Sequence, residues 1–171
     1  MLSFLERIFS KCPQNIKEQC YFALVRPLIE YGCSAWDPYK DCLIDKLELL
    51  NKRAARFVTG NHLLEHGETN KNMVTLGWPP LIERRSKAKL AMLYKIRTGL
   101  TLVPHEHLVI NFRKPDLYVL PHSGVDANLK SFFPSTIRLW NSIPSELRTC
   151  PSLASFKDSL EEITITQSYT N

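Results

Sequence analysis

Apolar residues recur at helical spacing along most of the chain, and the clearest case is the segment 39–59. Its apolar residues fall on one stripe with a period of 3.6 residues, as in an amphipathic helix. The stripe consists of Leu43, Leu47, Leu50, Ala54, Phe57 and Val58. Asp37 followed by Pro38 is typical of an N-cap with a first-turn proline, and Gly60 is a typical helix end. The pattern predicts one long helix here.

Two further long helices are predicted, one on each side of this segment. The first covers 14–33, and its residues 20–29 are apolar almost all round, which is typical of a helix in the middle of a fold. Pro27 is expected to kink it. The second covers 81–98 and ends at Gly99.

The helical period is lost at 100–131, where prolines interrupt two short strand-like runs at 108–112 and 117–120. A long loop or one small hairpin is expected there. Short helices follow, one opened by Pro134 and one capped by Ser152.

The predicted fold class is therefore mainly α, an irregular helical bundle of about five to six helices. Four regions are expected along the chain. Residues 1–99 form a helical core region with the basic helices, 100–131 a variable loop or hairpin, 132–164 short C-terminal helices that pack back, and 165–171 a frayed tail.

The composition is that of a folded domain. The 171 residues are 44% apolar and 23% charged, close to the average of globular proteins. No stretch approaches the roughly 20 apolar residues of a membrane-spanning helix, and the first ten residues, which include Glu6 and Arg7, do not form a signal peptide. The sequence favours an intracellular protein with no membrane partner.

Five cysteines without a C-x-x-C pair favour free thiols over disulfides or zinc ligands.

Positive charge is concentrated in the middle of the chain. The net charge is +5. Residues 40–97 contain 12 Lys/Arg and 6 Asp/Glu, whereas the rest of the chain contains 10 and 11. A basic segment of this kind permits an anionic partner but does not require one.

On the predicted helix 39–59, Lys52, Arg53 and Arg56 lie away from the apolar stripe. Acidic residues precede them by one to two turns, which complements the helix dipole. Glu48 is also placed to pair with Lys52 four residues later. The helix dipole and this ion pair explain the charge pattern of the helix without a ligand. The alternative interpretation is that Lys52, Arg53 and Arg56 contact a phosphate.

The basic residues of the predicted helix 81–98 are harder to explain by its own sequence. Arg84 and Lys87 are expected on its outer side, whereas Arg85 and Lys89 fall between its two apolar edges. These cations need an anion from elsewhere in the fold or a phosphate, unless their long stems snorkel at the edge of the core. All three interpretations stay open at this point.

No motif for catalysis or metal binding is found in the sequence. Paired aspartates of the kind that hold metal ions in polymerases and nucleases are absent, as are P-loop, dinucleotide-binding and nucleophile-elbow motifs. His105-Glu106-His107 is the one metal-like spacing, and a solvated loop is the preferred interpretation. His62 and His66 lack an H-E-x-x-H pattern. No catalytic residue, metal site or cofactor is predicted.

Several sequence blocks, read in order, resemble one protein family. They are CPQNIKEQCYFALVRPLIEYGCSAWDP (12–38), IDKLELLNKRAARFVTGN (44–61), LGWPPLIERRSKAKLAMLYKIRTGL (76–100), SFFPSTIRLWNSIPSEL (131–147) and CPSLASFKDSL (150–160). The chain is similar to the C-terminal part of the reverse transcriptases of non-LTR (LINE-type) retrotransposons of the CR1/Jockey-like kind. The resemblance covers nearly all of 12–160, although 101–130 matches poorly.

The resemblance implies a fragment of an enzyme without its catalytic centre. A full-length protein of that family has an endonuclease domain and then a reverse transcriptase, an RNA-directed DNA polymerase that uses Mg²⁺. Its palm carries the catalytic aspartates in a Phe/Tyr-Ala-Asp-Asp motif. The stretch resembled here lies downstream of that motif, in or after the thumb, so the resemblance carries over no catalytic residue. It implies a non-catalytic piece of a transposable element that lacks fingers and palm.

A thumb-side segment of a polymerase is expected to grip the template–primer duplex through its phosphates. From charge and position, we predict contacts to RNA or an RNA–DNA duplex first by Arg84, Arg85, Lys87 and Lys89, and then by Lys52, Arg53 and Arg56. Tyr94 is the one aromatic residue among them expected to be exposed for stacking on a base.

Two alternatives to this hypothesis are kept. In the first, the chain is an α-helical scaffold or interaction module, whose apolar surface meets an upstream reverse transcriptase palm or, without the palm, causes self-association. In the second, the chain is the product of a decayed element and has no selected function.

Overall fold

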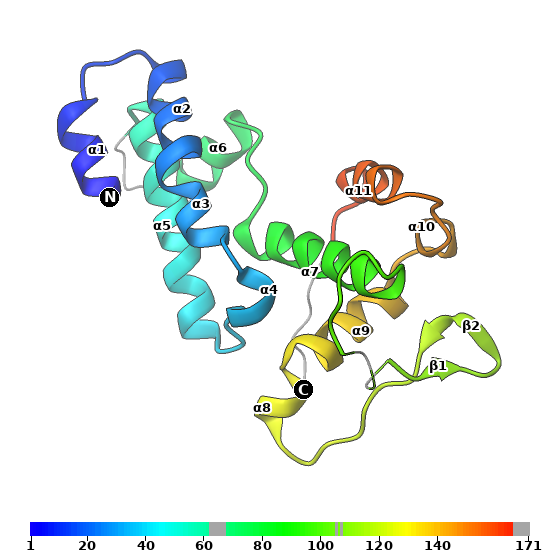
Figure 1. Ribbon diagram of the computed structural model, residues 1–171. Helices are drawn as coiled ribbons and strands as arrows, with labels where there is room; N and C mark the ends of the chain where they lie inside the picture. The colour runs from blue at the N-terminus through cyan, green and yellow to red at the C-terminus, as the bar shows by residue number, and fades with distance from the viewer. Residues whose placement is uncertain (62–67, 105, 107, 166–171) are drawn as a thin grey trace. The chain divides into compact units, whose positions relative to one another are not determined.

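Helices dominate the computed structural model, which describes residues 1–61, 68–104, 106 and 108–165 (Figure 1). Within that part of the chain, a two-stranded antiparallel sheet is the only β structure. The prediction of a mainly-α fold is confirmed. There are more helices than predicted, because some expected helices are split and several single-turn helices join them.

The chain forms two compact units. Unit 1 consists of 1–33 and 38–82, and unit 2 of 34–37 and 83–171. The expected regions placed a boundary at 99, after the second basic helix. The structure instead puts nearly all of that helix, α7 (Leu81–Arg97), in unit 2, because its apolar side chains pack into the core of that unit.

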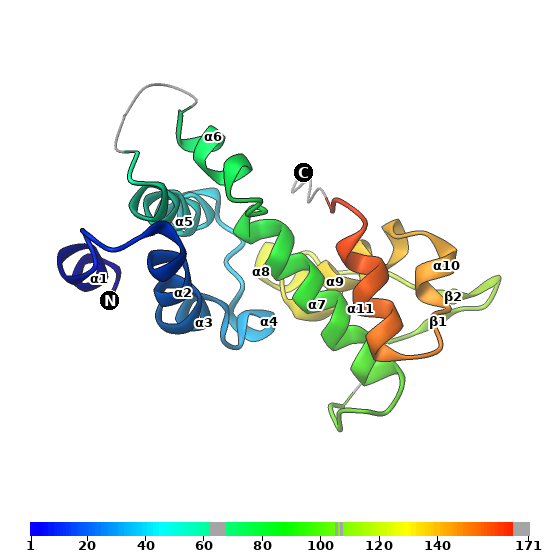
Figure 2. The same cartoon turned by 90° about the horizontal axis from the view of Figure 1, so that it is seen from above.

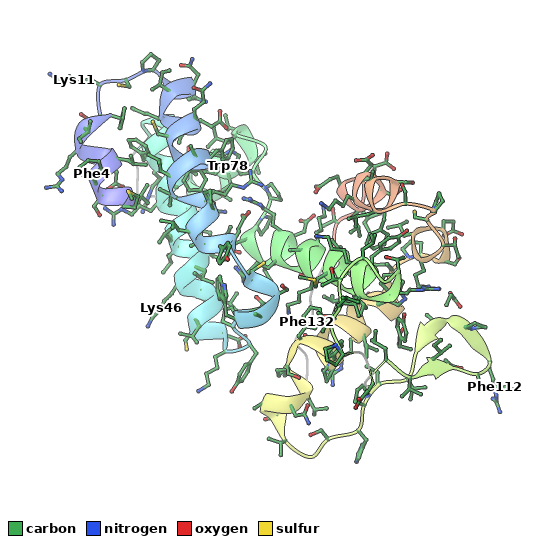
Figure 3. The ribbon with its side chains drawn as sticks, viewed as in Figure 1. Phe4, Lys11, Lys46, Trp78, Phe112 and Phe132 are labelled. Atoms are coloured by element: carbon green, nitrogen blue, oxygen red, sulfur yellow. The ribbon has the colours of Figure 1, made fainter. Side chains whose placement is uncertain are left out.

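Unit 1 is built around α5 (Asp41–Thr59), the helix that the apolar stripe predicts. Packed on it and around it are α1 (Leu2–Ile8), α2 (Gln14–Leu24), α3 (Arg26–Glu30) and α6 (Glu68–Thr75). The rings of Tyr21 and Trp78 stack 4.6 Å apart in its core. The phenol of Tyr21 donates to Asn51 Oδ1 at 2.8 Å, and its burial raises the pKa of that phenol. The indole of Trp78 (labelled in Figure 3) donates to Glu18 Oε1 at 3.0 Å. The first of these hydrogen bonds links α2 to α5, and the second links α2 to the segment that follows α6.

The predicted helix 14–33 is wrong as one continuous helix, although an interruption was expected at Pro27 and is present there. The helix is broken into α2 and α3 at Val25, two residues before Pro27, whose ring cannot continue the hydrogen-bond ladder. It also buries only one face, with Tyr21 and Val25 inside, while Leu24 and Leu28 on the other side face solvent. The all-round apolar pattern therefore marks an exposed apolar surface and not a central helix.

The two ends of α5 differ in how well the sequence predicted them. Gly60 ends the helix in the left-handed conformation, with φ of +69°, as predicted. The start is different, because α5 begins at Asp41 with Lys40 at the N-cap position. Asp37 is not the N-cap, and its carboxylate is used elsewhere.

Unit 2 contains the rest of α7, most of α4 (Cys33–Trp36), α8 (Asp126–Leu129), α9 (Phe132–Ser142), α10 (Ser145–Arg148) and α11 (Leu153–Glu161). Its core lies among α7, α9 and α11, and α7 and α11 run side by side in Figure 2. Trp140 is fully buried there, and Tyr94 stacks on Phe156 with ring centres 4.7 Å apart. The expectation that Tyr94 is exposed for base stacking is therefore wrong. Ser152 caps α11 as predicted, because its hydroxyl accepts from Ser155 N at 3.2 Å.

The expected small hairpin is present in the proline-rich region. It consists of β1 (Ile110–Asn111) and β2 (Lys114–Tyr118), paired antiparallel. Most of the tail predicted at 165–171 lies outside the described residues. Among the helices that the structure describes, none has the length and apolar composition to cross a lipid bilayer.

Candidate nucleic-acid interface

Two of the predicted cations of α7 are internal. The side chains of Arg85 and Lys89 are only 1% and 3% exposed, and both meet the carboxylate of Asp37. Arg85 Nε donates to Asp37 Oδ1 at 2.7 Å, and Lys89 Nζ forms an ion pair with Asp37 Oδ2. Lys89 Nζ also reaches Ser135 Oγ at 3.5 Å. Asp37 is thus the anion from elsewhere in the fold that these two cations need.

One carboxylate serves two buried cations, so its side chain is strongly held. In the described part of the chain, both terminal nitrogens of Arg85 are buried without a hydrogen-bond partner. A buried charge without its partner is costly, which makes Asp37 a structural residue of unit 2. Because Arg85 and Lys89 are shielded from solvent, a phosphate outside the protein does not reach them in this structure.

Lys87 was expected on the outer side of α7 but is almost completely buried. Its ammonium group lies 3.1 Å from Glu83 and 3.2 Å from Glu161. Burial lowers the pKa of Lys87, and hydrogen bonds to the two carboxylates outweigh this effect and raise it overall. Lys87 therefore links α7 to α11. Arg84, on the same helix, is half-buried.

Arg53 on α5 is held by an acidic residue of α1. Its Nε donates to Glu6 Oε1 at 2.8 Å, and its second terminal nitrogen contacts Glu6 Oε2 and, at 3.1 Å, Ser3 Oγ. The hydrogen bond to Glu6 raises the pKa of the Arg53 guanidinium. The geometry is bidentate, which is the favourable arrangement for Arg and a carboxylate. Half of the Arg53 side chain is still exposed.

Lys52 and Arg56 are the remaining predicted cations, and they lie one turn apart on α5. Both are partly exposed, and neither has an ion-pair partner within the described residues. The predicted pair between Glu48 and Lys52 is not formed. Glu48 instead accepts a hydrogen bond from Ile82 N at 2.8 Å, where it satisfies one of the free amides at the start of α7. This leaves Lys52 and Arg56 available for an anion.

Two further cations, missed by the sequence analysis, are exposed at the tip of the hairpin. Arg113 and Lys114 lie next to Phe112, and all three side chains face solvent. The signal in the sequence is the string Asn-Phe-Arg-Lys (111–114), which starts within the first strand-like run and continues past its end. Nothing in this local pattern shows that a hairpin presents these side chains to solvent.

Within the part of the chain that the structure describes, no group of three or more His, Cys, Asp or Glu side chains is arranged to hold a metal ion. His62 and His66, and also His105 and His107, lie outside the described residues. The cysteines are free thiols.

Comparisons with known proteins add no relative. No protein-family model, no curated protein and no solved structure matches the chain. The resemblance to reverse transcriptases therefore stays a prediction from the sequence blocks.

Proposed function

We propose that this chain is a non-catalytic, C-terminal part of the reverse transcriptase of a non-LTR retrotransposon, and that it helps to hold an RNA–DNA duplex or folded RNA. The ordered sequence blocks across 12–160 support the family. The observation that carries the binding role is the pair Lys52 and Arg56 on α5, both partly exposed and without an acidic partner in the described part of the chain.

The position of these two cations on α5 suits phosphate binding. The opposite face of the helix is fixed in the core of unit 1 by Ala54, Phe57 and Val58, so the helix is a firm support. Cations spaced by one helical turn meet phosphates without reading the bases. Binding of this kind is independent of sequence and sensitive to salt, because each contact releases a condensed counterion.

The proposal assigns no chemistry to the chain itself. The Mg²⁺ and the paired aspartates of a reverse transcriptase belong to the palm, which is an upstream partner in this view. The purified chain is expected to show no template-dependent DNA synthesis on a primed RNA template with Mg²⁺ and all four deoxynucleotides. Incorporation above a heat-denatured control would overturn this part of the proposal.

The binding role is tested by fluorescence anisotropy with a labelled RNA–DNA duplex over a series of salt concentrations. The logarithm of the binding constant is expected to fall linearly with the logarithm of salt concentration, by about 0.9 per phosphate contact. A chain that fails to bind at low salt, or that binds with no dependence on salt, contradicts the proposal.

A matched pair of double variants assigns the contacts. Lys52→Gln with Arg56→Gln is expected to reduce the salt slope by about 2 and to weaken binding to duplexes of any sequence equally. The control, Arg138→Gln with Lys157→Gln, removes the same charge from exposed positions on α9 and α11. If the salt slope of both double variants falls by the same amount relative to the wild type, the binding surface is not on α5.

A second candidate function is favoured by a separate observation. The outer side of α2 and α3 exposes Leu24, Leu28 and, just beyond, Tyr31, which is 86% exposed. Surfaces of this kind often mark protein contacts, so this face suits a scaffold or interaction module. Concentration-dependent sedimentation that is abolished by Leu24→Glu with Leu28→Glu, together with no RNA binding, would favour this function over the first.

A further inference from the structure

The tip of the β1–β2 hairpin presents an aromatic ring to solvent. Phe112 is 100% exposed, at the outer end of the hairpin (Figure 3). The side chains of Arg113 and Lys114 follow it directly and are also exposed. The only acidic residue of the hairpin, Asp116, is turned to Arg148, with 2.8 Å between Arg148 Nε and Asp116 Oδ2. The tip therefore combines one apolar ring with two unopposed positive charges.

The turn that carries Phe112 is held in place locally. The side-chain oxygen of Asn111 accepts hydrogen bonds from Arg113 N at 2.9 Å and from Lys114 N at 3.3 Å. Backbone pairing continues below the turn, where Val119 N donates to Val109 O at 2.8 Å. The ring is thus displayed by a defined turn.

The base of the hairpin is fixed to the core of unit 2. The amide of Asn141 bonds both backbone groups of Tyr118, accepting from its N at 3.1 Å and donating to its O at 2.8 Å. The indole of Trp140 donates to Asp116 O at 2.9 Å. Tyr118 itself is buried against Trp140. A hairpin anchored in this way supports a side chain at its tip without losing much conformational freedom on binding.

We propose that Phe112, with Arg113 and Lys114, is a contact for unpaired nucleotides: the ring stacks on a base and the two cations meet the neighbouring phosphates. Aromatic rings among cations are the common means of binding single-stranded nucleic acid, because every base has a stacking face. The inference rests on the proposed function, since it assumes that nucleic acid is the partner. It adds a preference for single-stranded regions at a place remote in sequence from α5.

A lipid surface is the other partner that a basic tip with an exposed ring can meet. The apolar part of the tip is one ring, which buries far less surface than a myristoyl chain. A myristoyl chain alone gives only marginal, reversible membrane binding. Stacking of one ring on one base, by contrast, strengthens binding by about 1–3 kcal/mol (about 5- to 100-fold) beyond what the phosphate contacts provide. The observations therefore favour nucleic acid.

The test uses the full chain and two probes: a blunt RNA–DNA duplex, and the same duplex with a single-stranded overhang that carries 2-aminopurine. Phe112→Ala is expected to weaken binding to the overhang probe by about 5- to 100-fold and to remove the change in 2-aminopurine fluorescence. Binding to the blunt duplex is expected to stay the same. Phe112→Trp is expected to retain both signals, because a larger ring still stacks.

The matched control is Leu102→Ala, which removes another almost fully exposed apolar side chain, 99% exposed, from unit 2. It is expected to leave both probes unaffected. Because Phe112 is fully exposed, its replacement by Ala should not change thermal unfolding, and this is checked for each variant.

The outcomes separate the two proposals. If the wild-type chain binds both probes and Phe112→Ala binds the overhang probe equally well, the hairpin inference is overturned and the proposed function stands. If the wild-type chain binds neither probe, both are overturned. Binding to phosphatidylserine vesicles that depends on Phe112, without any effect on nucleic acid, would assign the tip to a membrane and overturn the inference.

Discussion

Asp37 is the residue whose role differs most between sequence and structure. Its place before Pro38 suggests a helix cap, yet its carboxylate lies between Arg85 and Lys89. The local signal was misleading because the carboxylate of an aspartate suits both roles: it can accept hydrogen bonds from the first amides of a helix, or it can pair with cations. The two like charges on α7 were the better clue, since cations between apolar edges need an anion.

The ion-pair cluster predicts an asymmetry between breaking it and replacing it. Asp37→Ala leaves two buried cations without a carboxylate, so the free energy of unfolding is expected to fall by about 3–5 kcal/mol. Urea denaturation followed by circular dichroism measures this change.

The control replaces the whole cluster at once. Asp37→Leu with Arg85→Met and Lys89→Met removes every charge and keeps the approximate volume, so its stability is expected to lie within about 1 kcal/mol of the wild type or above it. A triple variant as unstable as Asp37→Ala would show that the charges themselves hold this part of unit 2.

Asp116 gives the fold a dependence on pH. Its hydrogen bond to Arg148 lowers the pKa of the carboxyl below its ordinary value of 3.8. The ionised form is favoured in the folded state, so the stabilisation is complete above about pH 4 and is lost as pH falls through the folded-state pKa. Asp116→Asn is expected to be less stable than the wild type at pH 6, and the difference should shrink toward pH 2. Thermal unfolding at pH 2, 4 and 6 measures it, and equal stabilities at pH 6 would contradict the assigned role.

At the scale of elements, the sequence was informative wherever a pattern is local. The existence of α5, the cap of α11 and the left-handed Gly60 depend on residues within a few positions of one another, and the structure has all three. The predicted stripe of α5 is buried only in part, because Ala54, Phe57 and Val58 are inside whereas Leu43 is 43% exposed. The break between α2 and α3 is also local, because its position follows from the ring of Pro27. The exposure of Leu28, by contrast, depends on what packs against the helix, which periodicity does not encode.

The end of α5 gives a direct prediction about backbone strain. Gly60 has φ of +69°, and a β-carbon there would meet no atom within 4 Å, so any cost of substitution comes from the backbone alone. Gly60→Ala is expected to destabilise the protein by about 1–2 kcal/mol. Gly124 is equally open but is not in the left-handed region.

Gly124→Ala is therefore the matched control. It is expected to be neutral or to stabilise the protein by up to about 1 kcal/mol, because alanine restricts the unfolded chain. Urea denaturation of both variants compares them, and equal effects at the two positions would contradict a specific role for the left-handed helix end.

The candidate site was only partly predictable, for the same reason as the fold. Lys52 and Arg56 are recognisable as lying opposite an apolar stripe. The partner of Arg85, by contrast, is 48 residues away in the chain, and its identity needed the tertiary structure. Phe112 was missed because nothing in its local pattern shows that a hairpin presents it to solvent.

At the scale of the whole molecule, the structure changes the meaning of the positive charge. The excess between 40 and 97 is not a uniform basic surface, because Arg85, Lys87 and Lys89 are buried against carboxylates. Unit 1 has ten Lys/Arg and eight Asp/Glu, and unit 2 has twelve and nine, so neither unit holds all the excess. The exposed cations are spread over both units and lie among acidic residues, which predicts a weak, salt-sensitive binder.

The central claim is that Lys52 and Arg56, the partly exposed cations of α5 without an ion-pair partner among the described residues, contact nucleic acid, and that the buried cations of α7 do not. It is tested most directly by measuring the acetylation of each lysine by mass spectrometry, with and without a saturating RNA–DNA duplex. The account predicts that the duplex protects Lys52, that Lys157 on α11 reacts equally in both conditions, and that Lys87 and Lys89 are poorly reactive in both. A Lys52 that reacts equally with and without duplex would contradict the account.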